Sequence, residues 1–255
     1  MKRFVALCAA AVCLWAAPPD PKKAGMDAEQ LALIPVRMKS FVNQGTLAGA
    51  VTLVARHGVV ARLDAVGYRD LENREPMRSD SIFQIMSMTK PVTAVGVMML
   101  MEEGRLALSD PVEKYLPEFL PLKRTWRPFT IRDLLTHTAG VNTPEMIHNI
   151  MSTFGATLAD AVSYYAQAPL EFEPGAQWKY SNAGIAVLGR IIEVVAGQPY
   201  ERFIDERILK PLGMQDSFFF QSENSSGLVS DSRLRMRTLA IAAGGVLTVN
   251  IPSVA

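Results

Sequence analysis

Two side chains that could act together on a carbonyl group, Ser87 and Lys90, lie three positions apart. The uncharged run Pro91 to Met101 follows them and predicts a buried helix that ends at Gly104. Residues i and i+3 of a helix share one face, with Cβ atoms about 5–6 Å apart. A serine needs a partner that takes its proton before it can attack, and a neutral lysine could be that partner. A Ser-x-x-Lys pattern also arises by chance roughly once in a chain of this composition, so the spacing alone does not establish catalysis.

A second set of polar side chains, Tyr180, Ser181 and Asn182, lies directly before another apolar run. A tyrosine can give or take a proton when nearby positive charge lowers its pKa, and Lys90 would supply that charge. An asparagine amide could orient a substrate carbonyl. The alternatives are a core tyrosine with a satisfied hydroxyl and an asparagine that only caps the helix.

The elements that must position these side chains form a strand hairpin followed by a long helical block, which is an α+β arrangement. Strands are predicted over Gly49–Ala55, Val59–Gly67 and Ile82–Ile85, with a turn at His57-Gly58. Helices are predicted over Asp27–Asn43, Pro91–Met101, Ile131–His137, Asn182–Ala196 and Pro199–Leu209, and within Thr143–Gln167. Pro35 predicts a kink or break, Arg69–Ser81 a polar loop, and Thr130 with Asp133 a capping box.

The first 17 residues are interpreted as a secretory signal peptide. They combine a positive start, Met1-Lys2-Arg3, with an apolar run, Phe4 to Trp15, that is too short to span a bilayer. Residues 18–26 then form a linker, and the mature protein is expected to be secreted or periplasmic, with no stable membrane span. A retained N-terminal anchor is the alternative.

Composition and charge argue against several classes of partner. The formal net charge is +1, which favours neither nucleic acid nor an anionic membrane surface. The three histidines, His57, His137 and His148, have no metal-ligand spacing, so we expect no metal site. No glycine-rich run follows a predicted strand as a nucleotide site requires, and no cofactor is expected.

Three blocks of the sequence, Phe83–Glu103, Thr130–Gly140 and Pro174–Gly189, resemble one family. It is the serine β-lactamase-like hydrolases, in the branch of class C β-lactamases, family VIII esterases and D-amino-acid peptidases. The resemblance implies a β-lactamase/transpeptidase-like fold, an antiparallel sheet with flanking helices and a helical subdomain. Residues 27–255 would be the related domain, divided into an N-terminal α/β part (27–86), a mainly helical part (87–220) and a truncated return segment (221–255).

The resemblance also implies a role for each candidate residue. Ser87 would be the acylated nucleophile, and its backbone N–H half of an oxyanion hole. Lys90 would share or relay its proton. Tyr180 would be the general base and acid, and Asn182 would bind substrate and brace Lys90. His137 would be structural, Trp178 would pack beside the site, and the substrate would be a small ester, amide or β-lactam.

One family motif, Lys-Thr-Gly or His-x-Gly, is not found before the chain stops at Ala255. By resemblance, the last sheet strands and the C-terminal helix are missing, on the order of a hundred residues in a domain of ordinary size. We therefore expect an unstable chain of weak or no activity. The first hypothesis is an exported serine hydrolase that forms an acyl-Ser87 intermediate. The Ser-Met-Thr-Lys motif slightly favours an esterase over a β-lactamase. The alternatives are a non-catalytic ligand-binding relative without the third motif and a fragment without function.

Overall fold

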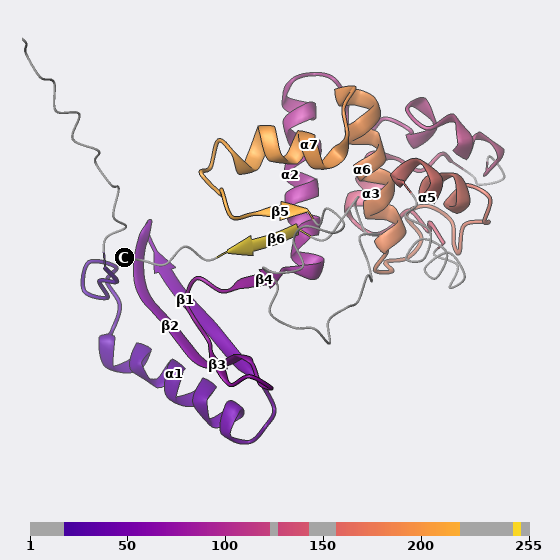
Figure 1. Ribbon diagram of the computed structural model, residues 1–255. Helices are drawn as coiled ribbons and strands as arrows, with labels where there is room; N and C mark the ends of the chain where they lie inside the picture. Colours follow the sequence, from indigo (N-terminus) through magenta and orange to yellow (C-terminus); the bar gives the residue numbers. More distant parts are fainter. Residues whose placement is uncertain (1–17, 123–126, 143–156, 220–246, 251–255) are drawn as a thin grey trace, which may run out of the picture. The chain divides into compact units, whose positions relative to one another are not determined.

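The computed structural model describes residues 18–122, 127–142, 157–219 and 247–250. The chain divides into two compact units (Figure 1). The described part of the first is residues 18–81, and the second spans Ile82–Asn250, of which residues 82–122, 127–142, 157–219 and 247–250 are described. The predicted signal peptide and most of the predicted return segment lie outside the described residues. In the described part of the chain, no helix is both long and apolar enough to cross a membrane.

The first unit packs a helix, α1 (Ala28–Asn43), against an antiparallel sheet with strand order β1-β2-β3. The strands are β1 (Gly49–Arg56), β2 (Val59–Asp70) and β3 (Glu75–Pro76). Asp27 caps α1, because its carboxylate accepts hydrogen bonds from the amides of Glu29 and Gln30. Leu31 of α1 belongs to a small buried cluster with Ala61 of β2 and Ala24.

The predicted hairpin is confirmed, and two details of this unit differ from the prediction. His57 and Gly58 both adopt positive φ, as a two-residue hairpin turn with the twist of its strands requires. Of the kink or break predicted at Pro35, the break is wrong, since α1 continues through this residue. Burial of Leu31 against the sheet outweighs the loss of one backbone hydrogen bond. The predicted loop Arg69–Ser81 contains β3, which is held against β2 and by an Arg69–Glu75 ion pair of 2.6 Å.

The second unit is mainly helical and carries a small antiparallel sheet of order β4-β6-β5. Its strands are β4 (Ile82–Gln84), β5 (Phe218–Phe219) and β6 (Leu247–Asn250). Its α-helices are α2 (Thr89–Glu102), α3 (Ile131–Leu135), α5 (Leu158–Tyr165), α6 (Asn182–Ala196) and α7 (Tyr200–Ile204). Shorter helical turns are η1 (Met86–Met88), η2 (Val112–Lys114), η3 (Pro117–Leu122) and the π-helical η4 (Asp205–Leu209).

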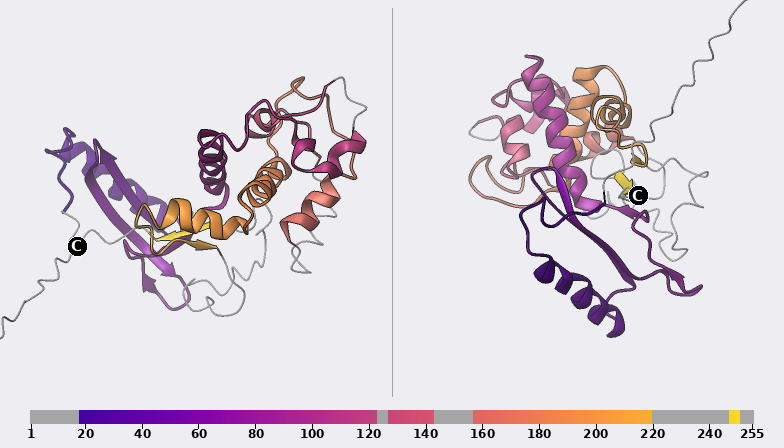
Figure 2. Two further views of the ribbon diagram at one scale, coloured as in Figure 1. Left: turned by 90° about the horizontal axis from the view of Figure 1, so that it is seen from above. Right: turned by 90° about the vertical axis from the view of Figure 1, so that its left-hand side faces the viewer.

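Helix α6 is the centre of this unit and contacts α2, α3, α5 and α7. Figure 2 shows α2 lying beside the orange helices α6 and α7 in two further views. All residues of α6 from Ala183 to Gly189 are buried. Gly96 lets α2 pack closely against α6 and α7, because a Cβ at this residue would lie 3.2 Å from both Ile192 and Phe203. The N-termini of two closely packed helices, α2 and α6, are therefore available to form one site.

Most predicted helices of this unit are confirmed, with shifted ends. Helix α3 stops at Leu135, two residues before the predicted end, because His137 adopts a left-handed conformation with φ of 60°. The capping box of Thr130 and Asp133 is present. Within the predicted helical region Thr143–Gln167, residues 143–156 lie outside the described chain and α5 occupies the rest. The predicted helix Pro199–Leu209 is divided between α7 and the π-helical η4.

Candidate active site

The first half of the site is built at the start of α2, from residues close in sequence. Ser87 lies in η1 and Lys90 in the first turn of α2, and the Lys90 Nζ donates a hydrogen bond of 3.2 Å to the Ser87 Oγ. Lys90 is only 9% exposed. Met86, directly before the serine, adopts φ of 48°, a strained conformation for a side chain of this kind. This backbone turns the chain from β4 into η1 and presents Ser87.

The second half comes from the segment before α6. The Tyr180 hydroxyl donates a hydrogen bond of 2.7 Å to the Ser87 Oγ, and the Lys90 Nζ donates one of 2.8 Å to the Asn182 Oδ1. The Lys90 Nζ also lies 4.7 Å from the centroid of the Tyr180 ring. The structure thus brings together all four predicted site residues. Ser87 Oγ is the meeting point, since it accepts from both Lys90 and Tyr180.

The electrostatics of the site favour ionisation of Tyr180. Burial of the phenol opposes ionisation, but hydrogen bonds with Lys90 and Ser87 and the positive charge of Lys90 outweigh it. The pKa of Tyr180 consequently lies below its ordinary value of 10.0. A phenolate at this position could accept the Ser87 proton across the 2.7 Å contact.

The segment that carries Tyr180 is anchored to the loop after α3. Gly140 adopts φ of +74°, and a Cβ at this residue would collide with the backbone carbonyl of Phe172. The amide of Glu171 donates to the Gly140 carbonyl at 2.8 Å, and the amide of Gly175 donates to the Thr138 carbonyl at 2.8 Å. These contacts fix the chain a few residues before the tyrosine.

Asp133 holds the same loop from the other side. Its carboxylate accepts two hydrogen bonds from Arg127, at 2.6 and 2.8 Å, and further bonds from Thr130 and Thr138. Burial opposes ionisation of this carboxyl, but the bonds from Arg127 and Thr130 outweigh it and lower its pKa to about 2. The predicted capping residue is therefore also the charged anchor of the loop.

Two residues with minor predicted roles lie against the site. The imidazole of His137 is stacked at a tilt on the Tyr180 ring, with centroids 5.1 Å apart, and Trp178 meets His137 edge-on at 6.1 Å. Trp178 is 67% exposed. The His137 contact has no signal in the sequence, because it depends on the left-handed backbone after α3.

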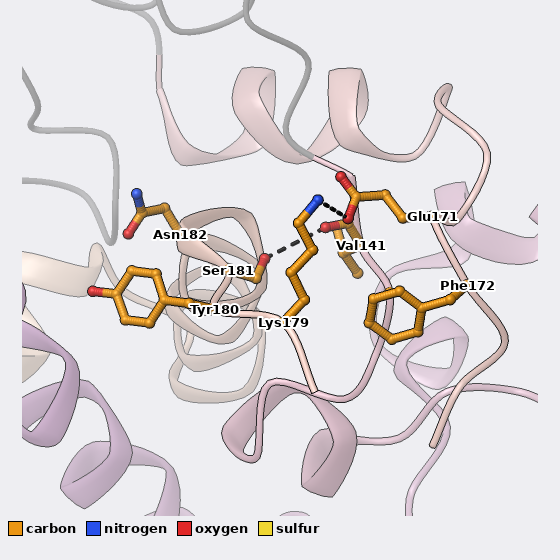
Figure 3. Close-up of a pocket in the computed structure, with 8 residues that line it drawn as sticks. Val141, Glu171, Phe172, Lys179, Tyr180, Ser181 and Asn182 are labelled. Atoms are coloured by element: carbon orange, nitrogen blue, oxygen red, sulfur yellow. Dashed lines mark hydrogen bonds and ion pairs between the residues drawn. The ribbon is translucent and has the colours of Figure 1, made fainter. Parts of the chain in front are cut away.

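A cavity of about 250 Å³ lies beside Tyr180 and Asn182 (Figure 3). Its other lining residues are Gly140, Val141, Glu171, Phe172, Lys179 and Ser181. Lys179 and Glu171 form an ion pair of 2.7 Å on one wall. Within the residues that the structure describes, no cluster of histidine, cysteine or acidic side chains could hold a metal ion.

Comparisons with known proteins identify relatives of this chain. The chain is 38% identical over 225 residues to the esterase EstB of Burkholderia gladioli, covering 82% of this chain and 56% of the relative. Among solved structures it is similar to EstCE1, a hydrolase with promiscuous acyltransferase activity. That match has a TM-score of 0.68 and 32% identity, and it covers 76% of this chain and 55% of the other.

The D-amino acid amidase of Ochrobactrum anthropi is a further structural neighbour, with a TM-score of 0.72 and 26% identity. That match covers 88% of this chain and 67% of the amidase. These neighbours define the β-lactamase/transpeptidase-like fold. The chain belongs to the beta-lactamase family, whose model matches residues 34–237. It spans about half the length of EstB and of EstCE1.

Proposed function

We propose that this chain carries the nucleophile, base and lysine of a serine hydrolase that forms an acyl-Ser87 intermediate. The observation that carries the proposal is the convergence of Tyr180 and Lys90 on the Ser87 Oγ, at 2.7 and 3.2 Å. A nucleophile within hydrogen-bond reach of a base, with the base stabilised by a third group, is the arrangement that activates a serine. The family and both halves of the site support this reading.

In the proposed reaction, the Tyr180 phenolate takes the Ser87 proton while the Oγ attacks the carbonyl carbon of the substrate. Collapse of the tetrahedral intermediate breaks the bond to the leaving group, and Tyr180 returns the proton to that group. Water then attacks the acyl carbon, Tyr180 takes a proton from it, and Ser87 leaves with that proton. Lys90 stabilises the phenolate.

Asn182 has two roles in this proposal. Its Oδ1 accepts from Lys90 at 2.8 Å and so keeps the ammonium between Ser87 and the Tyr180 ring. The amide nitrogen of the same side chain is a donor that could orient a substrate carbonyl. Substitution of Asn182 should therefore weaken both substrate binding and the ionisation of Tyr180.

The substrate class that fits is a small ester or amide. EstB is an esterase and the structural neighbour from Ochrobactrum is an amidase, and both support acyl transfer from an oxygen or nitrogen leaving group. The family name keeps a β-lactam as the third candidate. Export to the periplasm or outside the cell stays part of the proposal and depends on the predicted signal peptide.

A fluorophosphonate probe tests the proposal directly. The Ser87 Oγ should displace fluoride from phosphorus and add the mass of the phosphonyl group, which intact-protein and peptide mass spectrometry would locate. Ser87→Ala should remain unlabelled, whereas Ser163→Ala, in α5, should label like the wild-type chain. Absence of an adduct on a folded chain would contradict the proposal. If no adduct formed and esters or penicillins raised the melting temperature of the chain, the non-catalytic ligand-binding alternative would replace the hydrolase proposal.

A further inference from the structure

His137 lies in a conformation that few side chains adopt. Its φ of 60° is left-handed, directly after α3 ends. The loop around it is fixed, since the amide of Thr138 donates to the Asp133 carbonyl at 2.8 Å and the Thr138 hydroxyl bonds the Asp133 carboxylate at 3.3 Å. Strain of this kind persists only where the surroundings determine the backbone.

Both backbone amides that flank Tyr180 donate to this one residue. The amide of Lys179 donates to the His137 carbonyl at 3.0 Å, and the amide of Ser181 donates to the His137 Nδ1 at 3.3 Å. The imidazole ring also packs on the phenol, with centroids 5.1 Å apart. Tyr180 is thus held before, after and on its ring face by His137.

We propose that His137 is a positioning residue for Tyr180. Its neutral imidazole keeps the phenol in contact with Ser87 and Lys90, and its protonation releases the segment that carries the phenol. This inference rests on the proposed function, because Tyr180 matters as the base of that reaction. His137 itself does not touch the reacting atoms.

The protonation state follows from the donor at Ser181. A backbone amide can only donate, so the Nδ1 must carry a lone pair, and the proton of the neutral ring must lie on Nε2. Protonation would place an N–H opposite an N–H and break the bond. The titratable groups that the described structure places against the imidazole are Lys90 of α2 and Tyr180. Burial first, and then the charge of Lys90, lower the pKa of His137 below 6.5, so the neutral form prevails at neutral pH.

Two substitutions separate the role of the acceptor from the strain of the backbone. Asparagine tolerates positive φ and carries an acceptor Oδ1 where histidine has Nδ1, whereas glycine tolerates positive φ but carries no side chain. His57 has φ of 52° in the exposed hairpin turn of the first unit. His57→Gly is therefore a matched control that relieves the same backbone conformation in the other unit of the chain.

The measurements use the full chain and two readouts. The first is the rate of Ser87 labelling by a fluorophosphonate against pH, divided into its saturating rate and half-saturating concentration. The second is the pKa of Tyr180, followed by NMR of 13Cζ-labelled tyrosine and assigned with Tyr180→Phe. The second readout needs no chemistry at Ser87 and so distinguishes failure of this inference from failure of the proposed function.

His137→Gly should lower the saturating rate by about 10- to 100-fold with little change in the half-saturating concentration. It should also raise the pKa of Tyr180 toward its ordinary value. His137→Asn should restore most of the rate and remove the part of the acid loss of rate that comes from protonation of His137, leaving the part that comes from Tyr180 itself. His57→Gly should match the wild type. A His137→Gly chain with an unchanged Tyr180 pKa would overturn the inference even if Ser87 is labelled. If His137→Gly altered the pKa of Tyr180 but Ser87 was never labelled even in the wild-type chain, the positioning role of His137 would stand and the proposed hydrolase function would be overturned.

Discussion

The two halves of the site are positioned in different ways. Ser87 and Lys90 are three residues apart at one helix start, and their contact follows from helical geometry. Tyr180 and Asn182 reach the same point from more than ninety residues away, and they depend on His137, Gly140 and Asp133. The local half requires only that α2 forms. The remote half requires that a loop, a strained histidine and a tight backbone contact all form together.

The site is therefore more sensitive to substitutions in the loop after α3 than to substitutions that leave α2 intact. A substitution that leaves α2 intact should leave the Ser87–Lys90 pair in place. A substitution in the loop after α3 should leave a serine and a lysine without their base.

The largest effect is expected at the phenol itself. Tyr180→Phe keeps the ring that packs on His137 and removes the hydroxyl 2.7 Å from the Ser87 Oγ. We expect the rate of Ser87 labelling to fall by about 10²- to 10⁴-fold, the contribution typical of a general base. The melting temperature should change little, because Tyr180 is 46% exposed. If the Tyr180→Phe chain were labelled at the wild-type rate, Ser87 and Lys90 alone would be sufficient to activate the serine.

The next effect concerns the backbone that supports the remote half. Gly140→Ala introduces both a positive-φ alanine and a collision with the Phe172 carbonyl, and should cost about 2–4 kcal/mol of unfolding free energy. Gly104 has φ of +68° with no atom within 4 Å of an added Cβ, so Gly104→Ala should cost only about 1 kcal/mol. Urea unfolding of both variants measures the difference. Equal losses of unfolding free energy would show that the backbone at Phe172 moves away from the added Cβ at no cost in stability.

The two capping boxes provide a third comparison. Asp133 is buried and paired with Arg127, whereas Asp160 caps α5 with Thr157 on the surface. Asp133→Asn should cost about 2–3 kcal/mol, since it leaves Arg127 partly unpaired, and Asp160→Asn less than about 1 kcal/mol. Chemical denaturation at pH 7 tests both values. Similar losses of unfolding free energy in the two variants would contradict the role of Asp133 as the anchor of the loop.

The Asp133 pair should also appear in the acid stability of the chain. The pKa of this carboxyl is about 2 in the folded chain against 3.8 for the free group, so the unfolded chain takes up the proton first. The stabilisation is complete above about pH 4 and is lost as the pH falls toward 2. Melting temperatures over this range should fall more steeply for the wild type than for Asp133→Asn.

The smallest effect is the pH dependence of stability at His137. Its pKa is lowered in the folded chain, so the unfolded chain binds the proton more readily and stability falls as the pH drops below about 6.5. His137→Asn has no such group and should lose less stability between pH 7 and pH 5. Parallel thermal melts at both pH values provide the measurement, and parallel losses would exclude a neutral histidine in the fold.

The sequence predicted the local half of the site well and the remote half only by resemblance. An uninterrupted uncharged run located α2, apolar spacing located α6, and the capping box located the start of α3, because these signals depend on neighbours in sequence. That Tyr180 meets Lys90 followed from the motif order alone. The roles of these residues and the predicted domain boundaries stay predictions.

What the sequence did not reveal depends on tertiary contact. The left-handed His137, the close approach of Gly140 to Phe172 and the short β3 have no local signature. Pro35 shows the opposite error, since a strong local signal for a helix break was overridden by packing against the sheet. The truncation predicted from the missing third motif concerns residues that the structure does not describe.

The Lys90–Asn182 hydrogen bond joins residues 92 positions apart, and this separation has a consequence for folding. A loop of that length must close before the bond exists, so it belongs among the last contacts rather than the first. A nascent chain released after α2 would present an unactivated serine that is harmless to surrounding esters. Covalent labelling of Ser87 would then count only molecules that have completed folding, and so would serve as a titrant for the native fraction in a heterogeneous preparation.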